Sequence, residues 1–306
     1  MKTAIIVLNY NDFENTSKFI NKIKDYKSIN KFVVIDNNSN DGKYEQLKKL
    51  EELNSNIYVI KSDKNGGYSY GNNYGIKFLE EKFGKSYFDS YIISNPDIFV
   101  EDEVIEKCNE RLFEEEKLAI VAPRMYFVNG PARRSAWKKR TKLRDVANST
   151  RINQFIMYPI FKSGEYNSKE FKKEELYVDA IAGSFFIIKS KVMQEINYFD
   201  ENVFLFYEED ILSSKLLIKG YKILSINSLK FIHYDSQTIG KLMNMFKKQK
   251  ILFQSRIYYH KEYNKANKVY LILLSLLLYA RKFELLIEVP LRKVFNNKRR
   301  SNSEKK

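Results

Sequence analysis

The sequence predicts an α/β protein built on a mainly parallel β-sheet with helices on both faces. Five short apolar runs alternate with segments of helical periodicity in the N-terminal part of the chain; the runs are residues 4–8, 32–35, 57–60, 91–93 and 118–121. Strands that alternate with helices at this spacing are joined by right-handed crossovers, which makes neighbouring strands parallel. Ligands of such sheets bind beyond the carboxyl ends of the strands.

The middle of the chain is less regular. Periodicity fades over residues 123–175, and residues 131–144 carry seven Lys/Arg around the only tryptophan, Trp137. We interpret this stretch as an irregular insertion near the ligand site. Regular structure is expected again further on, as a strand at 176–189, a helix at 209–219 and a strand at 222–226.

The positive charge of the chain is concentrated at its C-terminal end. Residues 241–306 contain 17 Lys/Arg and 4 Asp/Glu, a net charge of +13, which leaves +2 of the total +15 for residues 1–240. A length of 306 residues suffices for one large domain with an appendage. We therefore expect an α/β domain at 1–240 and a basic helical tail at 241–306.

The sequence points to the cytoplasm. With the single cysteine Cys108, no disulfide forms within a chain, which fits a reducing compartment. Only five apolar residues, 4–8, precede the polar residues 9–12, so we expect no secretory signal and interpret this run as a strand.

Polar side chains follow the first two expected strands. Asn9, Tyr10 and Asn11 come after the first, and a turn that begins at Asp36 and includes Ser39 comes after the second. In a parallel sheet both groups reach the same edge, where Asp36 could accept a hydrogen bond from a base or ribose and Tyr10 could stack on the base. Alternatively, these residues only form turns and helix caps.

A glycine-rich segment opens the next expected helix. It runs from Asn65 through Gly67 and Asn73 to Gly75. Glycine lets the backbone approach a ligand closely, and free amides at a helix N-terminus favour an anion such as a diphosphate. The glycine spacing matches neither the Rossmann nor the P-loop pattern.

Two further sites offer metal-binding side chains. The strand at 91–93 leads into Asn95-Pro96-Asp97, and the Asp97 carboxylate together with substrate phosphates could hold a divalent cation. An ordinary proline turn is the alternative. His233 follows a later strand and could be a second ligand, although a lone histidine more often has a structural role.

Three consecutive carboxylates, Glu208, Glu209 and Asp210, follow an aromatic run at 204–207. Acidic residues at a helix start are stabilised by the helix dipole, which is the structural interpretation. The functional interpretation is that adjacent carboxylates beside aromatic rings repel and desolvate one another, which raises a pKa and suits a general base.

In their order, these motifs resemble family 2 of the inverting glycosyltransferases, which have the GT-A fold, a Rossmann-like sheet with helices on both faces. The resemblance spans roughly residues 1–240. It covers the opening strand and turn, the acidic turn, the glycine-rich helix start, the metal motif, an acceptor-side strand and the acidic helix start, carried here by Ile5–Asn11, Val33–Ser39, Asn65–Gly75, Asn95–Asp97, Gly183–Phe185 and Phe199–Asp210.

The resemblance implies a role for each motif. Asp210 would be the catalytic base and Glu209 its acidic neighbour, while Asp97 and His233 would hold Mg²⁺ or Mn²⁺. The reaction would be a direct displacement at the anomeric carbon of a nucleotide-sugar. The residues expected to contact that donor are Asn9, Tyr10, Asn11, Asp36, Asn65, Gly67, Asn73 and Asn95, and, from charge alone, Arg133 or Arg134 on the leaving group.

Two departures from the family pattern narrow this expectation. The metal motif is Asn95-Pro96-Asp97 rather than Asp-x-Asp, a variant that recurs among relatives resembling rhamnosyl- and galactofuranosyltransferases. The Gln-x-x-Arg-Trp motif of processive synthases is absent at Trp137. We therefore expect one sugar to be added per reaction, from dTDP-rhamnose or a UDP-sugar, to a saccharide or lipid-linked acceptor of surface polysaccharide synthesis.

The tail contains twelve uncharged residues, Val269–Ala280, fewer than the roughly 20 needed to span a bilayer. Flanked by lysine and arginine, this run is typical of a helix on an anionic membrane surface, here the inner face of the cell membrane. Helices packed on the catalytic domain with a solvated basic end are the alternative. The sequence leaves a homodimer open.

Two other functions are each consistent with part of the sequence. A nucleotidyltransferase would need a glycine-rich loop that residues 4–13 lack. A nucleic-acid-binding protein would use the basic tail with its interleaved aromatic residues, which are Tyr258, Tyr259, Tyr263 and Tyr270. That function leaves the ordered acidic motifs unexplained, so we expect no nucleic-acid partner.

Overall fold

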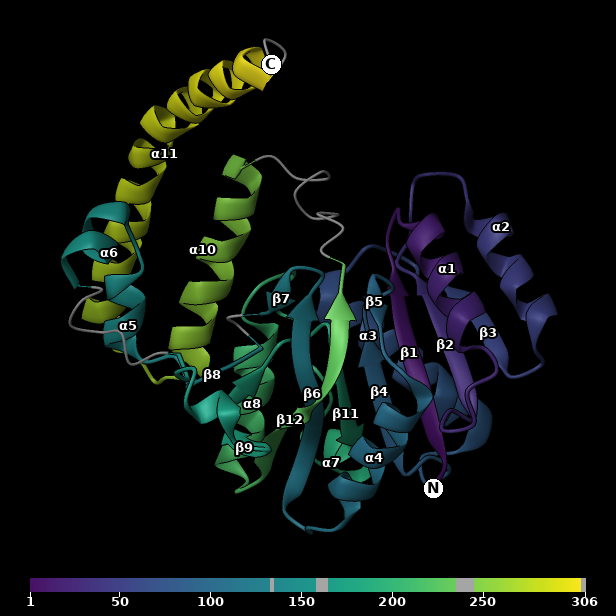
Figure 1. The fold of residues 1–306 in the computed structure, drawn as a ribbon. Coiled ribbons are helices and arrows are strands. Elements are labelled where there is room, and N and C mark those ends of the chain that lie inside the picture. The colour runs from purple at the N-terminus through teal and green to yellow at the C-terminus, as the bar shows by residue number, and fades with distance from the viewer. Residues whose placement is uncertain (133–134, 158–164, 235–244, 304–306) are drawn as a thin grey trace. The chain divides into compact units, whose positions relative to one another are not determined.

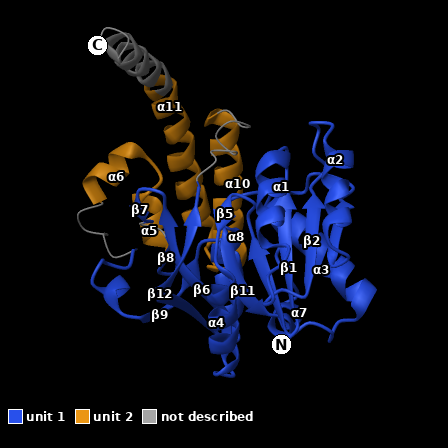
Figure 2. Ribbon diagram, turned by 45° about the vertical axis from the view of Figure 1, so that its right-hand side comes forward, with its two compact units in different colours: residues 1–139, 165–241 blue, residues 140–164, 242–306 orange. Residues whose placement is uncertain are grey.

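The computed structural model describes residues 1–132, 135–157, 165–234 and 245–303, with side chains as far as Glu288 (Figure 1). The chain forms two compact units (Figure 2). Unit 1 comprises residues 1–139 and 165–241, and unit 2 comprises residues 140–164 and 242–306. The structure thus groups residues 140–164, the middle of the expected insertion, with the C-terminal tail.

Unit 1 is built on one large mixed sheet. Its main strands follow in the order β3 (Ile57–Lys61), β2 (Lys31–Asp36), β1 (Thr3–Asn9), β4 (Ser90–Ser94), β11 (Phe185–Lys189), β6 (Leu118–Phe127), β12 (Lys222–His233) and β5 (Ile98–Phe99). The β3–β2, β2–β1, β1–β4 and β6–β12 pairs are parallel. β11 lies antiparallel to both of its neighbours. The expected mainly parallel sheet is confirmed.

Helices cover both faces because the side chains of each buried strand alternate in direction. Ile5 and Val7 pack with α1 (Phe13–Ile23), α2 (Tyr44–Lys48), η1 (Lys49–Leu53) and α4 (Asp102–Phe113). Ala4 and Ile6 pack with α3 (Gly67–Phe83), α7 (Ser190–Glu195) and α8 (Glu208–Ile218). Both faces of β1 are therefore buried, which is why its sequence is a continuous apolar run rather than an alternating one.

The segment expected as one strand at 176–189 is three strands with different partners. β9 (Glu175–Val178) pairs with β12, β10 (Ala180–Ile181) pairs with β8 (Ala136–Trp137), and β11 inserts between β4 and β6. The chain changes partner around Gly183 and Ser184. The strand expected at 222–226 continues to His233 as β12, past a register shift between Ile226 and Lys230.

Shorter elements complete unit 1. They are β7 (Gly130–Pro131), which pairs with the end of β6, and η3 (Glu170–Lys172). Cys108 on α4 is fully buried, and burial raises the pKa of its thiol. A buried thiol of raised pKa is an inert core side chain.

Unit 2 consists of helices. They are α5 (Lys142–Ala147), α6 (Arg151–Met157), α10 (Met245–Glu262) and α11 (Lys268–Ser303). In the part of the chain that the structure describes, no helix combines the length and the apolar character needed to cross a membrane.

A buried ion cluster joins α5 to α10 within unit 2. The Asp145 Oδ2 atom lies 2.7 Å from His260 Nε2, and both side chains are fully buried. Burial acts to raise the pKa of Asp145, but the hydrogen bond from His260 and the charges of Arg256 and Arg140 outweigh it and hold that pKa well below its usual range. Removing one member of such a cluster leaves a buried charge without compensation.

Two glycines with positive φ allow the cost of backbone strain to be compared with the cost of a steric collision. Gly67 has φ 87°, and an added Cβ would lie 1.9 Å from the carbonyl oxygen of Phe204. Gly84 has φ 95° with no atom within 4 Å of such a Cβ. Because ψ 146° at Gly84 adds to its strain, we expect Gly84→Ala to lower the free energy of unfolding by about 2 kcal/mol, and Gly67→Ala by at least about 4 kcal/mol. Urea denaturation of both variants measures the difference, and equal losses would refute the close approach.

Candidate active site

The ends of three parallel strands converge at one edge of the sheet. The register pairs Asn9 of β1 with Asp36 of β2, and Val7 of β1 with Ser94 of β4. The polar residues that follow these strands therefore share an edge, which is where open α/β sheets bind ligands.

Asn9 and Asp36 form a buried polar pair. The Asn9 Nδ2 atom donates to Asp36 Oδ1 at 3.0 Å, and Asn9 Oδ1 accepts from Thr16 Oγ1 at 2.9 Å. The side chain of Asn9 thus fixes the orientation of the Asp36 carboxylate. The other oxygen of Asp36, Oδ2, accepts a long hydrogen bond of 3.4 Å from the Ser39 amide.

Asn11 closes the turn after β1. It has φ 51°, a left-handed conformation that asparagine tolerates better than most residues. The Asn11 amide donates to Ser39 Oγ at 2.9 Å, and its Oδ1 accepts from the Asn40 amide at 2.9 Å. The two turns are thereby joined, and the half-buried Tyr10 is carried at their rim.

The start of α3 is tied to the end of β2 by asparagines. Asn65 Oδ1 accepts from the Gly67 amide and from Asn37 Nδ2, both at 3.2 Å, and Asn37 Nδ2 also donates to the Gly67 carbonyl at 3.1 Å. The sequence predicts Asn37 only as part of the turn that begins at Asp36. Its place directly after the strand was the signal that could have singled it out.

Asn73 is occupied by a different segment. Its Nδ2 donates to the Phe199 carbonyl at 2.9 Å and to Glu201 Oε1 at 2.7 Å, and its Oδ1 accepts from the Phe199 amide at 3.0 Å. With all of these groups engaged, the buried Asn73 side chain holds residues 199–201 against α3 in this structure.

Asp97 and His233 face each other across an antiparallel pair of strands. β5 pairs with β12 so that His233 lies opposite Ile98, and the Asp97 Oδ1 atom lies 3.2 Å from His233 Nε2. Both side chains are largely buried, and neither imidazole nitrogen makes a hydrogen bond of good geometry. A carboxylate oxygen beside an unsatisfied imidazole fits a divalent cation with mixed oxygen and nitrogen ligands.

This pair is a partial ligand set. Among the residues described, no group of three or more His, Cys, Asp or Glu side chains could hold a metal. A cation there would need substrate oxygens to complete its coordination, as magnesium-type sites at phosphates commonly do. Asn95 lies two residues before Asp97, and its amide donates to the Ser184 carbonyl at 2.8 Å.

Gly183 connects α3 to α8. The Tyr68 hydroxyl donates to the Gly183 carbonyl at 2.7 Å, and the Gly183 amide donates to Glu209 Oε1 at 3.2 Å. Burial raises the pKa of Tyr68 well above its usual range, and the nearby charges of Glu209 and Glu208 raise it further. The half-buried Glu209 therefore stands at the strand that the family resemblance places on the acceptor side.

Asp210 is held by the only tryptophan of the chain. The Trp137 Nε1 atom donates to Asp210 Oδ1 at 2.8 Å, and the Asp210 carbonyl accepts from Ser214 Oγ at 2.8 Å. Asp210 is 3% exposed. The pairing of β8 with β10 positions Trp137, so the segment interpreted as an irregular insertion supplies this contact.

Glu208 is buried with one carboxylate oxygen unsatisfied. Its Oε2 atom is buried without a hydrogen-bond partner. Burial raises the pKa of Glu208 well above its usual range, and the neighbouring charges of Glu209 and Asp210 add to the effect. Phe206 and Tyr207, each at φ 70°, direct the chain into α8 through two consecutive left-handed residues, a strained conformation for non-glycine residues.

The other residues predicted to contact the donor fall into two groups. Arg133 and Arg134 lie outside the described residues. The other predicted positions lie at the strand ends, at the start of α3 or at the start of α8, and Asn73 lies on α3 facing residues 199–201.

The sequence matches the model of the glycosyl transferase family 2 over residues 4–196, and the chain belongs to this family. A relative from Haloferax volcanii, the low-salt glycan biosynthesis hexosyltransferase Agl10, is 27% identical over 207 residues. The rhamnosyltransferase WbbL of Escherichia coli K12 is 23% identical over 180 residues. These matches cover 67% and 55% of this chain and 58% and 61% of the relatives, so the chain spans about three fifths of their lengths.

The fold is that of the GT-A glycosyltransferases. A crystal structure of GalNAc-T7 with UDP, GalNAc and Mn²⁺ superposes with a TM-score of 0.57 at 13% sequence identity, covering 76% of this chain and 44% of that one. At this identity the likeness establishes the architecture of the sheet and its helices alone.

The burial of Glu208 makes stability depend on pH. Its pKa in the folded state lies above the value of 4.5 for an ordinary glutamate, so the folded state loses stability as the pH rises above 4.5 and the carboxyl is forced to ionise. We expect Glu208→Gln to melt at a higher temperature than wild type at neutral pH, with the difference shrinking as the pH falls toward 4.5, because both states of wild type then become protonated.

Thermal unfolding followed by circular dichroism between pH 4 and pH 8 measures this effect. Glu14→Gln, at a glutamate whose side chain is 74% exposed, controls for the loss of one negative charge. A Glu208→Gln protein that is less stable than wild type at every pH would show that the carboxylate is ionised and paired.

Proposed function

We propose that this protein is an inverting glycosyltransferase that moves one sugar from a nucleotide-sugar to a saccharide or lipid-linked acceptor. The observation that carries the proposal is the shared edge of the unit 1 sheet. Asp36 ends β2, Asp97 follows β4 and His233 ends β12, strands whose carboxyl ends lie at that edge, and Gly183 links α3 to Glu209 of α8. Nucleotide, leaving group and acceptor each have a suitable side chain at this edge.

The donor half of the site fits a nucleoside diphosphate. The fixed Asp36 carboxylate can accept from a base or ribose, and the first amides of α3 favour a diphosphate. We propose dTDP-rhamnose or a UDP-sugar as donor, with support from the rhamnosyltransferase name of one relative and from the UDP in the similar structure. Asn9, Asn11 and Asn65 hold the turns. We propose that Tyr10 stacks on the base and that Asn95 contacts the donor.

Asp97 and His233 would hold the divalent cation, Mg²⁺ or Mn²⁺. When bound, the cation would neutralise charge on the departing diphosphate. The nitrogen ligand favours Mn²⁺ over the harder Mg²⁺. Arg134 is proposed to add positive charge near the same group.

The acceptor half of the site centres on the start of α8. We propose Asp210 as the base that removes the proton from the acceptor hydroxyl, with Glu209 as its neighbour. The Trp137 N–H donates to one oxygen of Asp210 and so fixes the orientation of the carboxylate. Glu209 accepts from the Gly183 amide, so it can fix the acceptor-side strand.

The setting proposed for the reaction is glycan assembly at the inner face of the cell membrane. The basic unit 2 is proposed to bind an anionic membrane surface, and a homodimer is compatible with this location. The rival nucleic-acid function draws less support from the structure, because Tyr259 is fully buried and the Tyr270 hydroxyl donates to the Lys142 carbonyl. These rings are engaged inside unit 2 and are not free to stack on bases.

Substitution of the carboxylates tests the proposed chemistry. Asp210→Asn should lower kcat for sugar transfer by about 10²–10⁴-fold, because general-base catalysis contributes on this order, while donor affinity stays unchanged. Transfer to a panel of saccharide acceptors, and donor binding by calorimetry, measure the two quantities. If Glu209→Gln loses more activity than Asp210→Asn, the two roles are exchanged. If no nucleotide-sugar binds or turns over in the presence of metal, the proposed function is wrong.

Substitution of the cation ligands tests the metal site. We expect Asp97→Asn and His233→Ala each to weaken Mn²⁺ binding by more than about tenfold, measured by titration in the presence of the nucleoside diphosphate. Asp25→Asn, at an aspartate whose side chain is 81% exposed, should leave the affinity unchanged. Unchanged Mn²⁺ affinity in both ligand variants would place the cation elsewhere.

A further inference from the structure

Unit 2 exposes an apolar stripe along α11. Seven large aliphatic or aromatic side chains between residues 269 and 287 are more than half exposed. They are Val269, Ile272, Leu276, Tyr279, Phe283, Leu286 and Ile287. From Val269 to Ile287 the stripe is about 27 Å long at 1.5 Å per residue. Soluble surfaces rarely leave so continuous an apolar strip uncovered.

The stripe lies opposite the face by which α11 packs inside unit 2. The packed face carries Leu274, Leu278 and Leu285, which are at most 6% exposed. At about 100° per residue, Leu276 and Phe283 lie roughly 180° around the helix from Leu274. The charged residues within this span, Arg281, Lys282 and Glu284, fall outside the stripe on the same wheel. The helix therefore has two apolar faces, of which unit 2 uses one.

A second helix from a distant part of the sequence extends the stripe. α6 exposes Ile152, Phe155 and Ile156, at 63%, 86% and 61%, and none of its residues is buried. Glu284 of α11 accepts hydrogen bonds from the first amides of α6, at 2.9 Å from the Arg151 nitrogen and 3.4 Å from the Ile152 nitrogen. One carboxylate thus fixes the N-terminus of α6 to α11.

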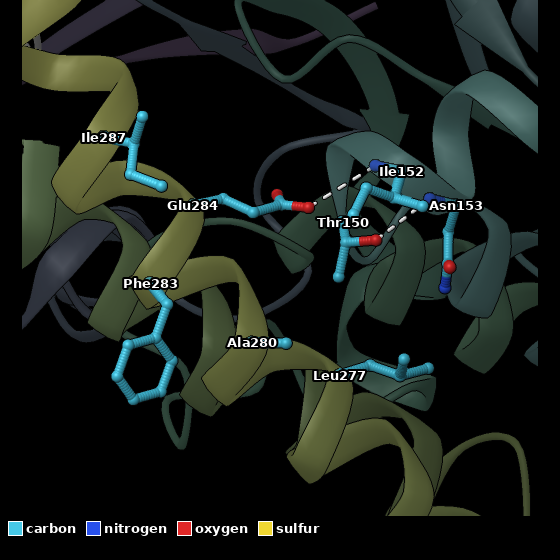
Figure 3. A pocket seen from close by; sticks show the side chains of 8 residues that line it. All are labelled: Thr150, Ile152, Asn153, Leu277, Ala280, Phe283, Glu284 and Ile287. Carbon is cyan, nitrogen blue, oxygen red and sulfur yellow. Dashed lines mark hydrogen bonds between the residues drawn. The ribbon is translucent and has the colours of Figure 1, made fainter.

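The two helices enclose an open apolar pocket of about 420 Å³. Figure 3 shows its lining side chains with Glu284 extending from α11 toward the Ile152 backbone nitrogen. The apolar lining comes from both helices and includes Ile152, Leu277, Ala280, Phe283 and Ile287. The exposed side chains of α6 and α11 therefore form one surface, which we call the α6–α11 face.

The charge of unit 2 selects the occupant of this face. Its described residues 140–157 and 245–288 contain 13 Lys/Arg and 4 Asp/Glu, a net charge of +9. A second copy docked on the face would bring two such units together, and like charges oppose that contact. An anionic lipid surface combines hydrocarbon for the stripe with negative charge for the basic residues.

We propose that the α6–α11 face inserts into the headgroup boundary of an anionic membrane, with Phe155 and Phe283 as its anchors. This rests on the proposed function in one respect, because a lipid-linked acceptor would be presented at that surface. It goes beyond the expected basic tail by assigning part of the surface to α6, a segment more than 80 residues before the tail begins. The inserting surface is thereby defined by named side chains from two helices.

Flotation with lipid vesicles tests the proposal on the full chain. We expect wild-type protein to float with vesicles containing phosphatidylglycerol and not with pure phosphatidylcholine vesicles. The Phe155→Gln/Phe283→Gln double variant should lose at least about tenfold in partition to the anionic vesicles, since each anchor removes apolar area from the membrane. Ile218→Gln, at an isoleucine that is 73% exposed on α8 of unit 1, is the matched control and should float as wild type.

Three outcomes would overturn the proposal. In the first, the double variant floats as well as wild type. In the second, wild type binds both kinds of vesicle equally. In the third, wild type is a dimer and the double variant is a monomer that floats as well as wild type, which would make a second copy the occupant of the face. Thermal unfolding checks that both variants are folded, and single substitutions at Ile156 and Ile287 to Gln repeat the test if the double variant is not.

Donor hydrolysis without vesicles separates this inference from the proposed function. If wild type hydrolyses the donor but does not float with anionic vesicles, the membrane face is refuted and the proposed function is not. Flotation that depends on Phe155 and Phe283 without any nucleotide-sugar turnover would support the face and refute the proposed function.

Discussion

The two backbone polar groups of Gly183 organise the candidate site. The Gly183 carbonyl accepts from Tyr68 on α3, and its amide donates to Glu209 on α8, so one residue fixes the distance between two helices that cover the same face of the sheet. The next residue, Ser184, accepts from the Asn95 amide and brings the strand end before Asp97 into the same group. A Cβ at Gly183 would approach the Tyr68 hydroxyl to 3.0 Å and Glu209 Oε1 to 3.1 Å, so any other residue would push these two side chains away by a few tenths of an ångström.

Most of the sheet could be predicted because its strands are buried on both faces. A continuous apolar run such as residues 4–8 needs no partner information to be recognised. The region around 176–189 could not be resolved, since its three strands differ only in what they pair with, and those partners lie far away in sequence. Likewise, nothing local in residues 140–147 indicates that Asp145 packs against His260, 115 residues later.

The site shows the same division between local and distant information. Positions directly after strands, such as Asp36 and Asp97, follow from the geometry of a parallel sheet. The Asp97–His233 pair was expected from the family resemblance alone, because no local signal in the sequence gives the register of β5 against β12. Burial was also beyond the sequence, because the three adjacent carboxylates look alike there. In the structure Glu208 is enclosed, Glu209 is half-buried and Asp210 is bound by Trp137.

The bond between Trp137 and Asp210 gives the protein a built-in optical probe. Trp137 is the only tryptophan among 306 residues, so selectively excited indole emission comes from one point in the molecule. Its N–H lies 2.8 Å from a carboxylate oxygen, and the emission of an indole responds to a charge held that close. A ligand that draws this oxygen away therefore changes the intrinsic fluorescence of the unlabelled protein, and the signal originates at the proposed base itself.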